Sequence, residues 1–184
     1  MAEDIQQEAD WIKQYYVTVN SSLGGNVTSF SDWVDEKTLI ILEAKGEENY
    51  QFMGWSGIGD ASYTGSKNNY SLIITSPVNE TAHWKKIFRV AIESEFPVEG
   101  LGQYLDGESV ELLATESEGL LIRKIFQKWS GDIDSTSNPF IFTITRDMEI
   151  AANYTVNYTY FVVVILVLLI TIGIAVYLVV SKMR

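Results

Sequence analysis

Alternation of apolar and polar residues at period two recurs before residue 158 and predicts β-strands. The segments predicted as strands include residues 15–19, 38–44, 70–75, 88–92, 109–115 and 140–145. In the first segment, Tyr15, Val17 and Val19 fall on one face, as expected for a strand with one buried side. Polar stretches at residues 58–69 and 132–139 predict loops. This part of the chain is therefore predicted to be mainly β, with mostly antiparallel strands.

The run from Tyr160 to Val180 contains 21 residues and no charge. As a helix rising about 1.5 Å per residue, it spans about 30 Å, the hydrocarbon thickness of a bilayer. Tyr158 and Tyr177 lie near its two ends, where interfacial aromatic residues are common. A helix buried in a soluble core is the alternative. The length without charge favours one C-terminal transmembrane helix, with the lipid bilayer as its partner.

Two stretches of the chain share one motif. Phe52–Gly57 resembles Phe126–Gly131, and both contain Trp-Ser-Gly. Trp55 and Trp129 lie 74 residues apart. Self-similarity at a fixed spacing indicates a tandem array. We therefore predict two tandem β repeat units, stacked end to end ahead of the helix.

A closing Ala-x-aromatic motif ends each copy, at Ala82–Trp84 and at Ala152–Tyr154. The motif occurs a third time at Ala9–Trp11, with Trp11 73 residues before Trp84. We therefore expect the chain to begin in the tail of an earlier copy. A short helical lead-in over Ala2–Ile12, which is acidic and free of Gly and Pro, is the alternative.

These patterns divide the chain into five expected parts. They are residues 1–14 as the tail of a preceding repeat or lead-in, 15–86 as repeat 1, 87–157 as repeat 2, 158–181 as the transmembrane helix and 182–184 as a cytoplasmic tail.

The repeat pattern resembles the divergent internalin B-type repeat family of bacterial and archaeal surface proteins. Phe126–Tyr154 matches best and includes the Asn-Pro loop at Asn138. The first copy departs from the pattern, with Asn69 followed by Tyr70 where Asn-Pro is expected. The resemblance covers about residues 9–156. It implies β repeats at a cell surface and leaves the molecular role open.

The charge distribution predicts how the chain crosses the membrane. All 24 Asp and Glu and 11 of the 13 Lys and Arg precede the apolar run, so the body has a net charge of 11 − 24 = −13. An acidic body disfavours binding to nucleic acid. Lys182 and Arg184 follow the run, which favours a cytoplasmic C-terminus. We expect a single-pass protein of the cell membrane with an extracytoplasmic body.

No apolar signal segment follows Met1. An extracytoplasmic body therefore requires that Met1 is not the natural start, or that a partner or a tail-anchoring route delivers the chain.

Six of the nine Asn residues stand in Asn-x-Ser/Thr, the acceptor motif for N-glycosylation. The candidate sites are Asn20, Asn26, Asn69, Asn79, Asn153 and Asn157. The excess favours a glycosylated surface, as is common in archaea and eukaryotes. Cysteine is absent, which excludes disulfides, thiolate catalysis and zinc–thiolate sites.

His83 is the single histidine, on a predicted closing strand. Asp10 and Asn153 occupy its position in the other copies of the motif. A position that accepts Asp, His and Asn indicates an exposed strand residue rather than a general base. A serine nucleophile would depend on His83, and no Gly-x-Ser-x-Gly elbow accompanies it.

Asp132–Asn138 carries oxygen ligands at alternate positions, as the start of a calcium loop does. It lacks the glycine and the bidentate glutamate of such a loop, so we interpret it as a turn. We predict no catalytic, cofactor-binding or metal-binding residue, and no enzyme activity.

The five tryptophans could form a surface that binds a ligand, or they could pack inside the repeats. They are Trp11, Trp33, Trp55, Trp84 and Trp129. Their recurrence at equivalent places favours packing within and between repeats, because small β units need large side chains to bury enough area. We take Trp11, Trp55, Trp84, Trp129 and Tyr154 as the repeat signature.

These features together predict a non-catalytic, membrane-anchored stalk or interaction module of the cell envelope. It would hold an upstream domain or a protein partner at the surface. The alternatives are an accessory single-span subunit of a membrane complex and the membrane-proximal part of a surface hydrolase.

Overall fold

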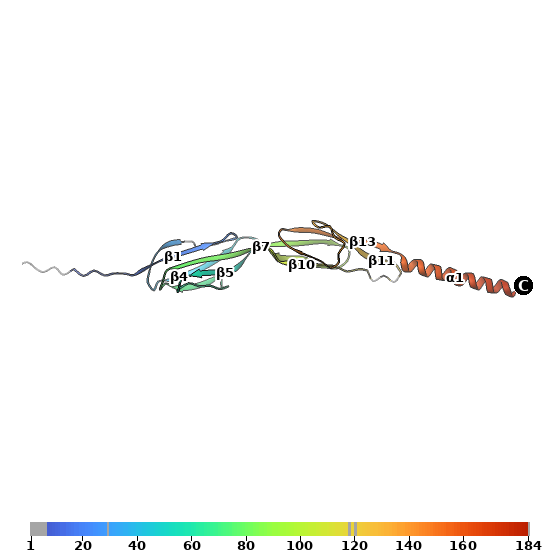
Figure 1. Cartoon of the computed structure of the whole chain (residues 1–184), viewed down its shortest axis with the longest axis horizontal. Coiled ribbons are helices and arrows are strands. Elements are labelled where there is room, and N and C mark those ends of the chain that lie inside the picture. The colour runs from blue at the N-terminus through green and yellow to red at the C-terminus, as the bar shows by residue number, and fades with distance from the viewer. Residues whose placement is uncertain (1–6, 29, 118, 120, 184) are drawn as a thin grey trace, which may run out of the picture. The chain divides into compact units, whose positions relative to one another are not determined.

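The computed structural model describes residues 7–28, 30–117, 119 and 121–183. Residues 1–6 of the expected lead-in and Arg184 of the expected tail lie outside these ranges. The structure has two compact units, Met1–Ile87 and Phe88–Arg184 (Figure 1). Each contains a β-sheet domain, and the chain ends in one helix, so the prediction of a mainly β fold with a C-terminal helix is confirmed.

The described residues of the first unit form seven strands in two sheets. They are β1 (Gln14–Ser21), β2 (Gly25–Val27), β3 (Phe30–Asp35), β4 (Leu39–Gly46), β5 (Tyr50–Ile58), β6 (Asn69–Ile73) and the first part of β7 (Val78–Ser94). The larger sheet has the order β3-β1-β7-β5 and the smaller one β2-β4-β6. The strands pair antiparallel except β1 and β7, which are parallel, with Val17 beside Val78.

The core of the first unit is formed by apolar residues from both sheets. Val17 and Val19 of β1 are 0% and 2% exposed, which confirms the expected buried face of this strand. Leu42 on β4 and Leu72 on β6 come from the smaller sheet and are also buried. Each sheet thus places an apolar face inward. The outward face of the smaller sheet is mixed, because Leu39, Ile41 and Ile73 are exposed there beside polar residues.

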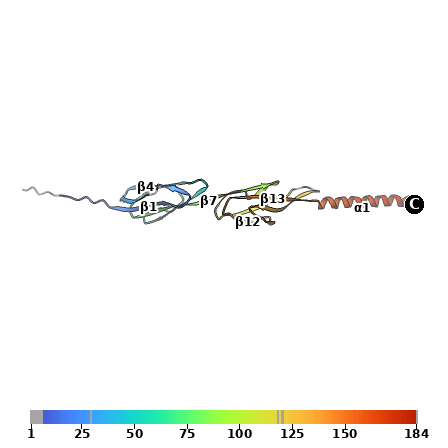
Figure 2. The same cartoon turned by 90° about the horizontal axis from the view of Figure 1, so that it is seen from above.

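The second unit repeats this plan. Its strands are the second part of β7, β8 (Val98–Glu99), β9 (Gly102–Leu105), β10 (Ser109–Ala114), β11 (Arg123–Gly131), β12 (Phe140–Thr143) and β13 (Met148–Asn157). The larger sheet has the order β9-β7-β13-β11 and the smaller one β8-β10-β12. Figure 2 shows β13 of the larger sheet and β12 of the smaller one on opposite sides of this unit. β7 and β13 are parallel, with Val90 beside Met148.

β7 differs from the expectation of two short strands. It is one strand of 17 residues that contains both the closing motif at Ala82–Trp84 and the opening segment at residues 88–92. No Gly or Pro occurs between Val78 and Ser94, so nothing in the sequence interrupts the extended backbone. Consequently the chain passes from the first unit to the second within a strand.

Residues 7–13 form neither helix nor strand. The helical alternative for Ala2–Ile12 is therefore wrong over its described part. Trp11 is 90% exposed, whereas Trp84, at the same place in the motif of repeat 1, is half-buried.

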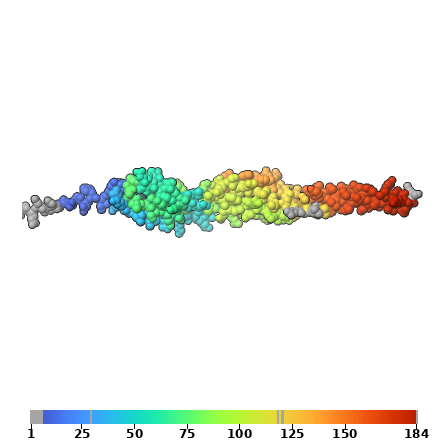
Figure 3. Space-filling view, turned by 90° about the horizontal axis from the view of Figure 1, so that it is seen from below, coloured from blue at the N-terminus to red at the C-terminus, as the bar shows by residue number. Residues whose placement is uncertain are grey.

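The C-terminal helix α1 extends over Thr159–Lys182, and none of its described residues is buried. A helix in a soluble core would bury one side, so that alternative is excluded. Figure 3 shows its side chains, in orange and red, at the molecular surface. By length and composition the helix can cross a membrane.

Candidate functional site

The tryptophan of the Trp-Ser-Gly motif binds the loop that follows it in each repeat. Trp55 and Trp129 are 2% and 0% exposed, at the end of β5 and of β11. The Trp129 backbone N–H donates to the Ser135 carbonyl at 2.8 Å, and its indole N–H donates to the Ser137 carbonyl at 3.0 Å. Two donors on one buried residue therefore hold the following loop in place.

The asparagine of the Asn-Pro loop fastens this loop to the smaller sheet. Asn138 Oδ1 accepts from the Ala114 N–H at 2.9 Å, and its Nδ2 donates to the Ala114 carbonyl at 2.8 Å. In repeat 1, where Pro is absent, the Asn68 carbonyl accepts from the Ala44 N–H at 3.1 Å instead. A backbone group thus replaces the side chain.

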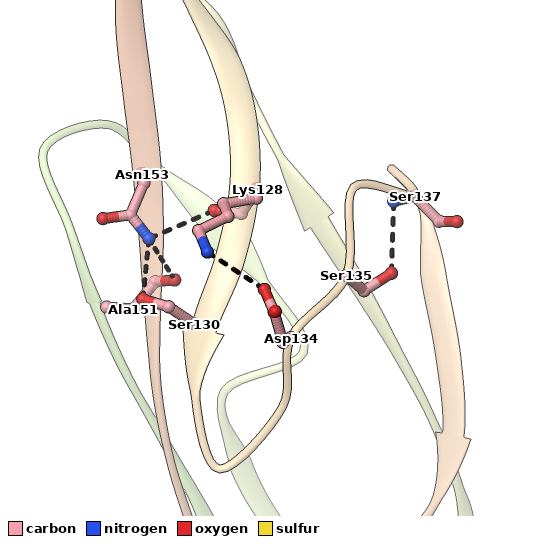
Figure 4. Close-up of polar contacts among 7 residues, drawn as sticks. All are labelled: Lys128, Ser130, Asp134, Ser135, Ser137, Ala151 and Asn153. Atoms are coloured by element: carbon pink, nitrogen blue, oxygen red, sulfur yellow. Dashed lines mark hydrogen bonds and ion pairs between the residues drawn. The ribbon is translucent and has the colours of Figure 1, made fainter.

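A hydrogen bond joins the serine of the motif to the adjacent closing strand in both repeats. Ser56 Oγ lies 2.6 Å from His83 Nε2. Asn153 Nδ2 donates to Ser130 Oγ at 2.7 Å at the equivalent place (Figure 4). Both pairs stand beside a β-bulge, which follows Phe52 in repeat 1.

The structure therefore places the single histidine of the sequence beside a serine. An amide cannot act as a general base, yet Asn153 makes the same contact as His83. This equivalence supports a structural role for the bond between Ser56 and His83. The sequence contained the signal, because both residues of each pair hold matching places in the two repeats.

The acidic loop after β11 is closed by its own contacts. Asp132 Oδ1 accepts from Arg146 Nη1 at 2.7 Å, and Oδ2 accepts from the Glu149 N–H at 2.7 Å. The Glu149 N–H, and then the Arg146 guanidinium, hold the pKa of Asp132 below its usual value. Asp134 contacts Lys128 Nζ at 3.1 Å (Figure 4).

These carboxylates are directed to N–H and ammonium groups, which supports the turn interpretation of Asp132–Asn138. The described part of the chain contains no group of three His, Cys, Asp or Glu that could hold a metal ion.

A buried acid in repeat 1 was missed from the sequence. Glu80 on β7 is 0% exposed, and Ile150 holds its place on β13. Glu80 Oε1 accepts from the Tyr63 N–H, whereas Oε2 is buried with no described partner. Burial raises the pKa of Glu80, and the hydrogen bond from Tyr63 opposes this shift.

The longer loop of repeat 1 explains Glu80. Gly65, the bridging partner of Trp55, follows it by ten positions, whereas Ser135 follows Trp129 by six. The additional backbone includes the Tyr63 N–H, which requires an acceptor beneath the loop. The sequence did contain a signal for this buried acid, because Glu80 stands between Val78 and Ala82 at alternate positions that share the buried face of one strand.

The tryptophans divide into buried and exposed sets. Trp55 and Trp129 belong to the two cores, and Trp84 and Tyr154 pack against them, as the packing interpretation expects. Trp33 does not, because it is 61% exposed on the outer side of edge strand β3. Its ring meets that of Tyr16 edge-on, with 5.5 Å between centroids. Trp11 is also exposed, on the segment before β1.

The acceptor asparagines differ in accessibility. Asn20, Asn26, Asn69 and Asn79 are exposed, and Asn153 and Asn157 are half-buried. The Asn153 Nδ2, the atom that a glycan would occupy, is engaged with Ser130. Asn157 Oδ1 accepts from the Thr159 N–H at 2.9 Å, at the start of α1.

Comparison with known proteins found one family model, described as the divergent InlB B-repeat domain, which matches residues 15–88 and 97–158. No curated protein and no solved structure matches the chain.

Proposed function

The chain belongs to the divergent InlB B-repeat family, and we propose that it is a non-catalytic, membrane-anchored repeat protein of the cell surface. One observation carries the proposal: the second repeat leads directly into a helix of 24 residues with no buried residue. The repeat body would serve as a stalk or interaction module for an upstream domain or a protein partner.

The exposed helix supports anchoring in lipid. Its large side chains, such as Leu168 and Ile170, are 51% and 61% exposed. Burying one such side chain yields about 1.5–3 kcal/mol, so leaving a whole helix of them in water is unfavourable. A bilayer covers every side of a single helix at once.

The charges support the proposed orientation. Lys182 in the last turn of α1 is a cation on the C-terminal side, whereas the body before the helix is acidic, with a net charge of −13. Cationic flanks favour the cytoplasmic side. We therefore place the body outside and the C-terminus in the cytoplasm.

The role without catalysis rests on the repeat symmetry. Ser56 and His83 are matched by Ser130 and Asn153, which form no acid–base pair. The carboxylates of the Asp132 loop are engaged by Arg146 and backbone N–H groups. Each arrangement that resembles a reactive site thus has a local structural explanation.

Extraction and protease protection of membranes containing the full chain test the proposal. We expect the chain to resist extraction by alkaline carbonate, and the body to be digested from the outer side while the C-terminal tail is protected. Release by carbonate, or protection of the body, would reject the proposed topology.

Purification in mild detergent tests the stalk role separately. A stoichiometric integral membrane protein in the purified sample would favour an accessory subunit over a stalk.

A further inference from the structure

Exposed apolar residues from two parts of the chain lie near the start of α1. We name this group the collar and define it as Leu121, Ile122, Val156, Tyr158 and Tyr160. These residues are 39%, 48%, 38%, 53% and 54% exposed. The first two belong to the loop before β11, so the collar is assembled from two parts of the chain that are separated in sequence. Exposed apolar residues gathered at one place indicate an interaction surface.

Two contacts hold this part of the chain to the helix, one from the loop and one from the first residue of β11. The Phe161 N–H donates to the Leu121 carbonyl at 3.2 Å. The first N–H groups of a helix lack partners within it, so this bond satisfies one of them. The Arg123 guanidinium lies 5.0 Å from the centroid of the Tyr160 ring. The loop therefore lies beside the first turn of α1 and is held there.

The charge pattern around the collar differs from the rest of the body. No charged residue occurs from Ile150 to Ser181, although the body as a whole is acidic. Lys124 pairs with Glu95, whereas the described contacts of Arg123 are the Tyr160 ring and the Gly119 carbonyl. Neither of these two described partners of Arg123 is a carboxylate.

Helix length sets the depth of the collar. The 24 residues of α1 extend about 36 Å, which exceeds the roughly 30 Å of the hydrocarbon core. The ends of the helix therefore reach the headgroup region. Irregular backbone is excluded from hydrocarbon but tolerated in that region, where water and polar headgroups are available. Aromatic residues are enriched at the same depth.

We propose that the collar lies in the headgroup region of the bilayer, with Leu121 and Ile122 as a second membrane contact beside the helix. Arg123 meets lipid phosphate there, and Tyr158 and Tyr160 occupy the interface. This inference rests on the proposed membrane span of α1. It assigns the loop before β11 a lipid partner, so that the second repeat contacts the bilayer through two segments of the chain.

Spin labels on single cysteines in the full chain test the proposal, because the natural sequence contains no cysteine. The labelled positions are Ile122→Cys in the collar, Ile141→Cys on β12 as an exposed apolar control, and Leu168→Cys in the middle of α1. Ile141 is 61% exposed, so all three substitutions spare the core. The protein is placed in phosphatidylcholine vesicles, and collision of each label with oxygen and with a water-soluble nickel chelate is measured.

We expect the ratio of oxygen to nickel collisions to be highest at Leu168, intermediate at Ile122 and lowest at Ile141. A ratio at Ile122 equal to that at Ile141, with a high ratio at Leu168, would overturn the collar while leaving the span intact. Low collision with both reagents at Ile122 would also overturn it, because a protein partner would then cover the loop.

A low ratio at Leu168 would reject the span and the collar with it. Leu121→Cys provides a second label in the same loop. Unchanged circular dichroism spectra and unfolding temperatures verify that each variant is folded.

Discussion

Ser56 Oγ lies 2.6 Å from His83 Nε2, and the same contact joins Ser130 to Asn153 in the second repeat. A serine beside a histidine usually directs attention to nucleophilic catalysis. Here the second copy reproduces the bond without a base. The conserved element between the two repeats is therefore a hydrogen bond between neighbouring strands next to a β-bulge.

The first prediction concerns this bond. We expect Ser56→Ala to lower the free energy of unfolding of the first repeat by about 0.5–1.5 kcal/mol, because one intramolecular hydrogen bond is lost. His83→Asn reproduces the serine–asparagine pair of the second repeat. It should change the free energy of unfolding by less than about 0.5 kcal/mol. Thermal unfolding in detergent measures both, with Ser130→Ala as the matched change. Labelling of Ser56 by a fluorophosphonate in the natural chain, but not in His83→Asn, would contradict a structural role.

The second prediction is a pH dependence from Glu80. Burial raises the pKa of Glu80 in the folded state, so the folded protein retains this proton to higher pH than the unfolded chain. Its contribution to stability is fully present below the unfolded pKa near 4.5 and is lost as pH rises through the folded value. Glu80→Gln should flatten this dependence and stabilise the first repeat at neutral pH by on the order of 1 kcal/mol. Equal unfolding curves for both proteins from acid to neutral pH would contradict this.

The third prediction exchanges Glu80 for the residue of the second repeat. Glu80→Ile leaves the Tyr63 N–H without its acceptor, so we expect a loss of about 1–3 kcal/mol in spite of the gain in apolar burial. Removing the additional loop residues together with Glu80→Ile should restore stability. Chemical denaturation of both variants measures the difference. Full stability of Glu80→Ile alone would show that the loop does not depend on the carboxylate.

The fourth prediction separates the acceptor asparagines. In a host that performs N-glycosylation, we expect occupancy at the exposed Asn20, Asn26, Asn69 and Asn79. Asn153 should be unmodified, because its Nδ2 is engaged with Ser130. We expect the same for Asn157, which is half-buried next to the start of α1. Mass spectrometry of glycopeptides from one digest compares all six sites internally. Full occupancy at Asn153 would contradict the prediction.

The fifth prediction compares two tryptophans. Trp129→Ala removes a fully buried indole and should cost about 3–5 kcal/mol. Trp33→Ala removes a ring that is 61% exposed and packed edge-on against Tyr16, so we expect a loss of about 0.5–1.5 kcal/mol. Unfolding temperatures of the two variants test the ranking. A larger loss for Trp33→Ala would restore the packing interpretation for that residue.

Local periodicity was sufficient for much of this fold. The alternation of Val17 and Val19 identified a buried strand face, because side chains on a strand point to opposite sides in turn. The run without charge identified α1 for a similarly local reason. The Trp-Ser-Gly spacing located two buried anchors, since each repeat solves the same packing problem with the same residue.

Features that depend on distant partners were not predicted. The parallel pairing of Val17 with Val78 joins segments that are 61 residues apart, and nothing in either segment encodes the direction of the other. Trp33 was assigned to packing together with the other tryptophans, but its neighbour Val34 occupies the inward side of β3. Glu80 depends on a loop that approaches it from elsewhere in the chain.

The continuity of β7 bears on how such arrays change length. In β7 the closing segment of one repeat continues into the opening segment of the next. A duplication or deletion of one repeat that begins and ends inside equivalent strands would create the same junction. The product needs no new turn and no new linker, because the junction is again an uninterrupted strand. Recombination at this strand can therefore add or remove copies at little structural cost, because the boundary between the two units, after Ile87, lies inside β7.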